Sequence, residues 1–401
     1  MTPRILLLFP GPVHFAEQLF RSRFEGLSRY FNGAVVAHGR ETPPPGTDEV
    51  VERHRFGAFD VRMLRYAWGR VERGRRMLRA VRELERDAGA WGQAFDLVVS
   101  YDPLQTGLVA VRTARRLKTP LVIEVNGDYW APSNYLDVKN PVSKALKRAT
   151  YVAVEAFVLG RADGIKLLYP SQLDPFRRFV RTTVVEAFSN YVDVEAFRDL
   201  GASREVLSVG FPFYVKGMDI LTEAFRRVAD EFPDWRLKIL GWYAGEELGR
   251  LKRAMGDHPR IRHHPPVPNR DMLEHIGRCG IMVLASRTEG MGRVLLEAMA
   301  AGKPRIGTRI GGIPTMIRDG VDGTLVPPED PAALARALRE LMGDADRRAA
   351  MGRAAASRAR EEFSVSAYLR NQRDLYYRVL RREAPDDAAA LPPSGREGSS
   401  H

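Results

Sequence analysis

Short apolar runs alternate with longer segments of helical spacing along most of the chain. Runs of about four to eight mostly apolar residues predict buried strands, and apolar residues that recur every three or four positions predict helices. In the first half, the predicted strands are 4–9, 95–101, 119–127, 164–170 and 182–190, and the predicted helices are 15–31, 106–118 and 141–162. In the second half, the predicted strands are 204–210, 235–242, 260–267, 279–286, 303–308 and 322–328, and the predicted helices are 217–232, 269–278, 292–302 and 330–344. Two such series in succession predict an α/β protein with two doubly wound domains built on parallel sheets.

The length and the end of the chain agree with this organisation. At 401 residues the chain is long enough for two domains that each bury a core. Parallel α/β sheets bind ligands beyond the carboxyl ends of their strands, so we expect the site in a cleft between the two domains. Residues 363–383 predict a long terminal helix, and 384–401, rich in Pro, Ala, Gly and Ser, predict a disordered tail.

The composition is that of an ordinary globular protein, with 44% hydrophobic and 28% charged residues. No apolar run approaches the length of about 18 residues that a membrane span needs. The N-terminal apolar run ends at Pro10, which is too early for a signal peptide and indicates a first strand. Cys279 precedes an apolar strand, so we expect a buried structural thiol. His263 and His264 are neighbours in a strand and point to opposite faces, which disfavours a shared metal ion.

The excess positive charge is concentrated in one stretch. The formal net charge is +12, and Glu52 to Arg86 contains eleven arginines and five acids. Such a stretch fits an anionic membrane surface or a phosphate-bearing substrate, and it equally fits a solvated helical face. Nucleic acid is disfavoured as a partner because no recognition motif accompanies the charge. The apolar residues interleaved with these arginines are Phe56, Phe59, Met63, Tyr66 and Trp68.

Two carboxylates flank the start of a predicted helix in the segment 286–304. Glu289 follows a predicted strand, and Gly290 and Gly292 allow backbone N–H groups to approach a ligand closely. The positive end of the helix favours an anion such as phosphate, and Glu297 lies about 9 Å further along the axis. Carboxylates beside a phosphate are expected to hold hydroxyl groups, so the layout fits a nucleotide sugar. The alternative is that Glu289 caps the helix and Glu297 is solvated on its outer face.

The segment 286–338 resembles the signature of the GT-B glycosyltransferases, specifically the retaining family 4 with its Glu-seven-residues-Glu motif. The similarity is dense from Val209 to Leu341 and looser over the first 200 or so residues. It includes a Lys-Gly pair, Lys216 and Gly217, and the family's domain junction at 189–197. The resemblance implies two Rossmann-like domains that face a central cleft. The implied segments are 1–195 on the acceptor side, 196–363 on the nucleotide-sugar donor side, and a helix, 364–383, that returns to the first domain.

The resemblance also implies a role for each matching residue. Glu289 and Lys216 are the catalytic candidates: Glu289 would contact the sugar hydroxyls, and Lys216 would neutralise the diphosphate as it leaves. Glu297 would hold the nucleotide ribose. A fixed ammonium and a helix N-terminus stabilise the charge that develops on a departing nucleoside diphosphate. The other donor-binding candidates are Gly11 at the phosphates, Pro266 and Val267 near the base, and Gly290, Met291, Gly292, Arg293 and Val294 around the sugar and diphosphate.

Two positions depart from the family pattern. Phe211 stands where members usually have an arginine beside the diphosphate, and Arg287 and Arg293 are the candidates to replace that arginine. Asn126 stands where many members have a histidine; an asparagine donates a hydrogen bond but cannot serve as a base at neutral pH. Asn126 and Asp128 are the acceptor-side candidates, and a structural turn is the alternative for Asp128.

The expected reaction is transfer of a sugar, with retention at the anomeric carbon, from a UDP- or GDP-type donor to a glycan or lipid-linked acceptor. No carboxylate is obviously placed as a covalent nucleophile, so front-face attack is favoured. Lys216 and the helix supply the electrostatic stabilisation, so neither a metal ion nor another cofactor is expected. Asp344 and Asp346 form an Asp-x-Asp between helical segments, where we expect them to cap a helix.

Other functions remain open. A GT-B epimerase would be expected to bring its own carboxylates and histidine in the first domain, and a phosphorylase would need a cofactor lysine in another context. A non-catalytic scaffold of a polysaccharide assembly complex is favoured by Phe211 and Asn126 but disfavoured by the intact Glu289, Glu297 and Lys216. A dinucleotide-dependent dehydrogenase is disfavoured because no strand leads into Gly-x-Gly-x-x-Gly. The expected location is the cytoplasm or the inner face of the cell membrane.

Overall fold

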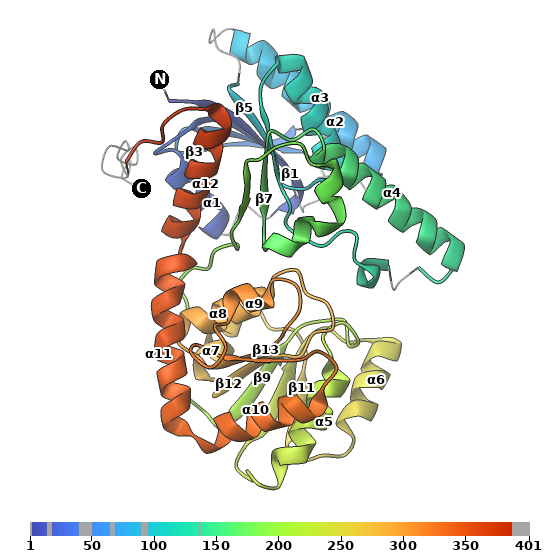
Figure 1. The fold of residues 1–401 in the computed structure, drawn as a ribbon, viewed down its shortest axis with the longest axis vertical. Helices are drawn as coiled ribbons and strands as arrows, with labels where there is room; N and C mark the ends of the chain where they lie inside the picture. Colours follow the sequence, from blue (N-terminus) through green and yellow to red (C-terminus); the bar gives the residue numbers. More distant parts are fainter. Residues whose placement is uncertain are drawn as a thin grey trace. The chain divides into compact units, whose positions relative to one another are not determined.

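Two β-sheets flanked by helices organise the chain (Figure 1). The computed structural model describes residues 2–13, 18–39, 50–64, 69–89, 95–135 and 138–386. The chain forms two compact units: unit 1 comprises Met1–Phe188 with Leu369–His401, and unit 2 comprises Ser189–Tyr368. Tyr66, Trp68 and most of the expected disordered tail, from residue 387 on, lie outside the described residues.

The sheet of unit 1 has eight strands in the order β3-β4-β2-β1-β5-β6-β7-β8. Neighbouring strands are parallel except for β3 and β4, which pair antiparallel at one edge. The apolar pattern did not indicate β2, β3 or β4, because arginines interrupt the apolar residues of β3 and β4 and the apolar run of β2 is short. The strands are β1 (Arg4–Val13), β2 (Asn32–Gly39), β3 (Val50–Phe56), β4 (Phe59–Leu64), β5 (Leu97–Ser100), β6 (Leu121–Glu124), β7 (Gly164–Leu167) and β8 (Val185–Ala187).

Helices cover the sheet of unit 1. Leu6 and Leu8 on β1 share one apolar core with Met77 and Val81 of α2 and Ala110 of α3, and all five side chains are at most 2% exposed. The helices are α1 (Gln18–Leu27), α2 (Arg70–Gly89), α3 (Gln105–Leu117), α4 (Pro141–Leu159) and α12 (Val365–Leu380), with the 3-10 segments η1 (Pro132–Tyr135) and η2 (Pro170–Phe179). This core fixes the carboxyl ends of β1 and β5 relative to the first turns of α2 and α3.

The part of α12 from Leu369 on belongs to unit 1, and a buried carboxylate holds it there. Glu124, at the end of β6, is fully buried. Its Oε1 accepts hydrogen bonds of 2.7 Å from Gln372 Nε2 and from the Tyr376 hydroxyl. A buried carboxylate is stable only when its oxygens have such partners, so this network ties the terminal helix to the sheet.

The sheet of unit 2 has six strands, all parallel, in the order β11-β10-β9-β12-β13-β14. The strands are β9 (Glu205–Val209), β10 (Arg236–Leu240), β11 (Ile261–His264), β12 (Ile281–Leu284), β13 (Arg305–Thr308) and β14 (Thr324–Val326). The helices are α5 (Met218–Ala229), α6 (Gly245–Met255), α7 (Asn269–Arg278), α8 (Arg293–Ala300), α9 (Ile313–Met316), α10 (Pro331–Gly343) and α11 (Ala345–Glu362). The predicted α/β class with two doubly wound sheets is confirmed.

Two structural expectations for individual residues of unit 2 are confirmed. Cys279 is fully buried, and this burial raises the pKa of its thiol to about 12. Asp344 caps α11, because its Oδ1 accepts a 2.8 Å hydrogen bond from the backbone N–H of Arg347. Neither residue therefore competes for a catalytic role.

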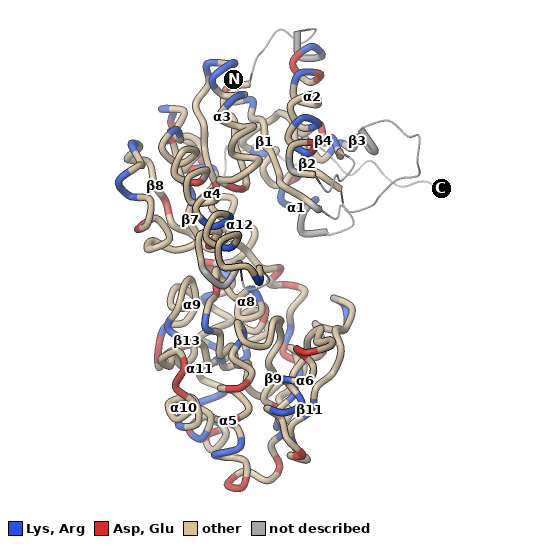
Figure 2. The backbone as a smooth tube through the Cα atoms, turned by 90° about the vertical axis from the view of Figure 1, so that its right-hand side faces the viewer, with Lys and Arg blue, Asp and Glu red and all other residues tan. Residues whose placement is uncertain are grey.

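The basic stretch Glu52 to Arg86 folds as β3, β4 and the larger part of α2. Phe56, Phe59 and Met63 are at most 8% exposed, so these interleaved apolar residues belong to the core and present no apolar surface to a membrane. The helix α2 carries acids among its arginines near both ends (Figure 2), and Arg76 pairs with Glu72 at 2.9 Å. Among the residues the structure describes, no helix combines the length and apolarity needed to cross a bilayer.

Candidate functional site

The central feature of unit 2 is an ion pair at the carboxyl edge of its sheet. Chain order reverses between β9 and β12, and ligands of open α/β sheets bind at such a switch point. Lys216 lies in the loop after β9 and Glu289 in the loop after β12. Lys216 Nζ and Glu289 Oε2 are 2.5 Å apart, and their side chains are 18% and 13% exposed. The fold therefore brings together two residues that are 73 positions apart in the sequence.

Arg287 links the two loops that carry this pair through hydrogen bonds. Its backbone N–H donates to Val215 O at 2.8 Å, and its Nη1 donates to Tyr214 O at 2.9 Å. The guanidinium also binds both carboxylate oxygens of Asp219, at 2.7 and 2.9 Å, and Glu329 at 3.1 Å. The hydrogen bond to Asp219 raises the pKa of Arg287. Arg287 is thus paired with two acids. Its role here is to position the Lys216 loop, and its charge is not left to bind a ligand.

The N-terminus of α8 adds backbone donors beside this pair. Its N-cap is Gly292, in the left-handed region with φ +74°, and no side chain caps the helix. Gly311 supports the loop from behind, since a Cβ there would lie 1.7 Å from the carbonyl oxygen of Glu289. The backbone N–H of Gly312 also donates to Gly290 O at 2.9 Å. Glu289 therefore does not cap α8. The Leu295 N–H donates to Gly292 O at 2.8 Å, so the N–H groups of Arg293 and Val294 are the ones that point out of the helix start.

Glu297 lies on α8 with its side chain only 16% exposed. Arg293 Nε is 3.1 Å from its Oε1, one turn earlier on the helix. Burial raises the pKa of Glu297, and the Arg293 charge opposes this shift. The alternative of a solvated Glu297 on the outer face does not match this burial.

An aromatic pair occupies the neighbouring strand ends, where the family pattern has an arginine. Phe211, after β9, is 41% exposed, and Trp242, after β10, is 63% exposed. Their rings pack edge to face with centroids 5.7 Å apart. Pro266 and Val267 follow β11, the next strand along the sheet, with Pro266 exposed and Val267 half-buried. Trp242 was not among the predicted site residues, although its position at the carboxyl end of a predicted strand was the available signal.

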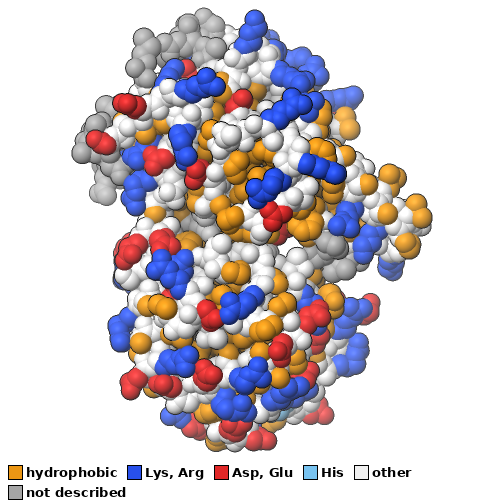
Figure 3. Space-filling view, in the orientation of Figure 1, with side chains coloured by type: hydrophobic (Ala, Val, Ile, Leu, Met, Phe, Trp, Pro, Cys, Tyr) orange, Lys and Arg blue, Asp and Glu red, His pale blue; other side chains and the backbone are white. Residues whose placement is uncertain are grey.

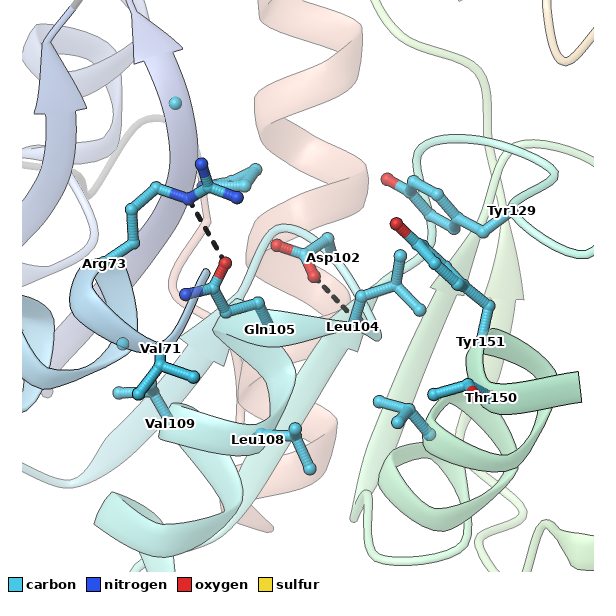
Figure 4. A pocket seen from close by; sticks show the side chains of 14 residues that line it. Val71, Arg73, Asp102, Leu104, Gln105, Leu108, Val109, Tyr129, Thr150 and Tyr151 are labelled. Carbon is cyan, nitrogen blue, oxygen red and sulfur yellow. Dashed lines mark hydrogen bonds between the residues drawn. The ribbon is translucent and has the colours of Figure 1, made fainter. Parts of the chain in front are cut away.

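Unit 1 contains a cavity of about 640 Å³ at its own switch point, between β1 and β5 (Figure 4). Gly11 on β1 lines it, and Asp102 and Leu104 follow β5. Most of the remaining wall is apolar or aromatic. It comprises Pro10, Val71, Arg73, Gly74, Gln105, Leu108, Val109, Tyr129, Thr150, Tyr151 and Val154. Asp102 was not among the predicted site residues, although it comes two residues after β5, where the ligands of such sheets bind.

Buried carboxyl groups lie at the cavity and beneath it. Asp102 is 3% exposed, and its Oδ1 accepts a 2.6 Å hydrogen bond from the backbone N–H of Leu104. Burial raises the pKa of Asp102. Glu155 of α4 is 1% exposed, and burial, with the nearby charges of Asp128 and Asp102, raises its pKa to about 8. Glu155 is therefore largely protonated at neutral pH.

This shift predicts a pH dependence of stability that Glu155→Gln removes. The native state binds a proton that the unfolded chain releases above pH 4.5, so the free energy of unfolding falls as pH rises from about 4.5 to 8. We expect the melting temperature of the wild type to fall more between pH 6 and pH 9 than that of the variant. Thermal unfolding at several pH values measures this, with Glu383→Gln as the exposed control. Parallel curves for wild type and Glu155→Gln would contradict the prediction.

The two acceptor-side candidates have partners within unit 1. Asn126 donates through Nδ2 to Tyr101 O at 3.1 Å, and its Oδ1 accepts from Lys166 Nζ at 3.0 Å. Asp128 accepts 2.5 Å and 3.1 Å hydrogen bonds from the Tyr169 hydroxyl and from Gln172 Nε2. Both side chains therefore stabilise the loop after β6. A contact with an acceptor would be a second role beside this structural one.

Two family models match the chain, one in each half. Residues 196–358 match the model described as glycosyl transferases group 1, and residues 28–190 match the model described as glycosyl transferase 4-like domain. Relatives include the D-inositol 3-phosphate glycosyltransferase of Corynebacterium kroppenstedtii, 34% identical over 46% of this chain and 43% of the relative. The enzyme of that name from Streptomyces coelicolor is 33% identical over 42% of this chain and 38% of the relative. These alignments span less than half the length of the curated relatives.

Solved structures share the fold over nearly the whole chain. Sucrose-phosphate synthase from Thermosynechococcus elongatus superimposes with a TM-score of 0.73 at 17% identity, covering 94% of this chain and 99% of that one. HepE of Anabaena, in complex with UDP-glucose, gives a TM-score of 0.65 at 16% identity, covering 92% of this chain and 98% of that one. At these identities the similarity shows the fold alone.

Proposed function

Because the chain belongs to the GT-B glycosyltransferases of family 4, we propose that it transfers a sugar, with retention, from a nucleoside diphosphate sugar to an acceptor hydroxyl. The observation that carries this proposal is the Lys216–Glu289 pair beside the uncapped N-terminus of α8. An ammonium and the first backbone N–H groups of a helix at one strand end suit a diphosphate. Glu289 then accepts hydrogen bonds from sugar hydroxyls while it holds Lys216 in place.

The proposed step is front-face substitution at the anomeric carbon. The bond from that carbon to the diphosphate oxygen breaks, and the bond to the acceptor oxygen forms on the same face. The leaving phosphate oxygen takes the proton of the acceptor hydroxyl, so no separate base is required. Lys216 and the α8 amides stabilise the charge that develops on the diphosphate, which supports a reaction independent of a metal ion.

The cavity of unit 1 supports an acceptor that has an apolar part. Its wall is mainly aliphatic and aromatic, whereas a site for an unmodified glycan needs many polar side chains. Asp102, Tyr129 and Tyr151 line this cavity and are the polar residues that would orient an acceptor hydroxyl (Figure 4). This lining favours a lipid-linked or aromatic acceptor over a bare sugar. Because relatives are named D-inositol 3-phosphate glycosyltransferases, a cyclitol phosphate is one acceptor to compare.

A panel of nucleotide sugars tests the proposal. The full chain is incubated with UDP-, GDP- and ADP-linked sugars, and both the melting temperature and the release of nucleoside diphosphate are measured, with and without a chelator. We expect the nucleotide sugars of one base to raise the melting temperature. One of these donors should be consumed, and the product should retain the anomeric configuration. If no nucleotide shifts the melting temperature, the scaffold alternative replaces the proposal. If the donor sugar is epimerised without transfer, the epimerase alternative does.

Replacing Glu297 by glutamine is expected to weaken donor use without unfolding the protein. A hydrogen bond to a charged group contributes about 1.5–3 kcal/mol, so loss of the carboxylate lowers kcat/KM by about 10- to 100-fold, mainly through the donor KM. Steady-state kinetics with varied donor measure this, and Glu340→Gln on the exposed face of α10 is the control. An unchanged donor KM would remove Glu297 from the ribose site.

A further inference from the structure

The helix α4 of unit 1 exposes an apolar stripe along most of its length. Val142 is 75% exposed, Leu146 is 67% exposed and Phe157 is 40% exposed. Ala149 and Ala153 are also exposed, and the five positions recur every three or four residues, which places them on one face of the helix. The helix is well formed there: Asn140 caps it by accepting hydrogen bonds of 2.9 and 3.0 Å from the next turn.

The opposite face of α4 is already used by the fold. Tyr151 and Val154 line the cavity of unit 1, and Glu155, Val158 and Leu159 are buried. The apolar stripe is therefore additional to the apolar residues that pack α4 on its own unit. Figure 3 shows hydrophobic and Lys or Arg side chains together along α4. A helix that only needed to be solvated on its outer face would carry polar residues at these positions.

The charged residues on the first half of α4 are all positive. Between Val138 and Val154 there are four cations, Lys139, Lys144, Lys147 and Arg148, and no acid. Lys147 lies over the Tyr135 ring at 5.7 Å, and Arg148 Nε donates to Trp130 O at 3.0 Å. Within the described part of the chain, none of the four forms an ion pair with a carboxylate. Lys147 and Arg148 are thus held in position without a described carboxylate partner, unlike Arg76 on α2.

We propose that α4 docks on an anionic lipid bilayer. In this arrangement Val142 and Leu146 insert at the boundary between headgroups and acyl chains, and the lysines contact lipid phosphates. Exposed apolar residues flanked by cations are the combination that interfacial helices use. A second copy of the chain fits poorly, because a symmetric contact through this face would place the same cations against one another. The proposal does not depend on the sugar donor.

Vesicle flotation of the full chain tests the proposal. The wild type is expected to float with vesicles of phosphatidylcholine and phosphatidylglycerol and not with phosphatidylcholine alone, and high salt should reduce the bound fraction. The double variants Val142→Glu/Leu146→Glu and Lys139→Glu/Lys144→Glu should each lower partitioning by about tenfold or more. Lys139, Val142 and Leu146 are exposed and Lys144 is half-buried, and all four are surface positions. The melting temperatures of the two double variants should therefore match that of the wild type.

Matched controls come from unit 2. Val321→Glu and Lys252→Glu replace exposed residues of the same types and should partition as the wild type does. The proposal is overturned if the wild type does not float with anionic vesicles at low salt, or if the α4 variants bind as well as the controls. It is also overturned if size-exclusion chromatography with light scattering shows a lipid-free dimer that Val142→Glu/Leu146→Glu dissociates, since the stripe would then be a contact between copies.

Discussion

Replacing Lys216 by methionine is expected to lower the rate of sugar transfer by about 10²- to 10³-fold, while donor binding weakens less. The reason is that the diphosphate gains charge as the anomeric bond breaks, so an ammonium at this position stabilises the transition state more than the bound donor. Methionine keeps the length and apolar stem of the side chain but removes the cation. Single-turnover measurements with saturating donor isolate this effect in kcat.

Two further variants separate the charge of Lys216 from its position. Lys216→Arg keeps the cation and the ion pair with Glu289 and should recover part of the lost rate. Lys252→Met, which removes an exposed lysine of α6, should leave the rate unchanged. If Lys216→Met retains the wild-type kcat, the ammonium does not act on the leaving group and the proposed mechanism is wrong.

Replacing Asp322 by alanine is expected to destabilise unit 2 by about 3–5 kcal/mol. Asp322 is 1% exposed and lies between two buried guanidinium groups: Arg305 Nη2 is 2.8 Å from its Oδ1, and Arg358 Nη1 is 3.0 Å from its Oδ2. Burial lowers the pKa of Arg305 to about 10, against the favourable charge of Asp322. Without the carboxylate, two cations remain buried next to one another with no acid between them.

Urea unfolding and hydrogen exchange measure this loss. The transition should move to lower urea, and the amides of β13 and β14 should exchange faster, which assigns the effect to unit 2. Glu231→Ala, which breaks the exposed pair with Arg339 on α10, is the control and should change the midpoint far less. Equal midpoints for Asp322→Ala and Glu231→Ala would show that the buried cluster does not hold α11 to the sheet.

Much of the fold follows from local patterns. The eleven predicted strands are present. Several of them, such as β5, β6 and β12, are short apolar runs that a parallel sheet buries on both faces. The pattern was insufficient for β3 and β4, where Arg53, Arg55 and Arg62 interrupt the apolar residues. An edge pair with one partly polar face can accommodate such residues, and their pairing depends on neighbours that are distant in the sequence. For the same reason the sequence pattern indicated that the whole basic stretch lies on the surface, whereas Phe59 and Met63 belong to the core.

The sequence by itself determined the two doubly wound sheets, the family, and the residue types placed after their strands, because these depend on periodicity and on short motifs. Only the tertiary structure decided which of those residues meet. Lys216 and Glu289 come together because β9 and β12 are neighbours in the sheet, and Arg287 is withdrawn from the site because Asp219 and Glu329 reach it. The exposure of Val142 and Leu146 likewise depends on which face of α4 the unit covers. Distances and burial arise from contacts between remote segments, and no local pattern encodes them.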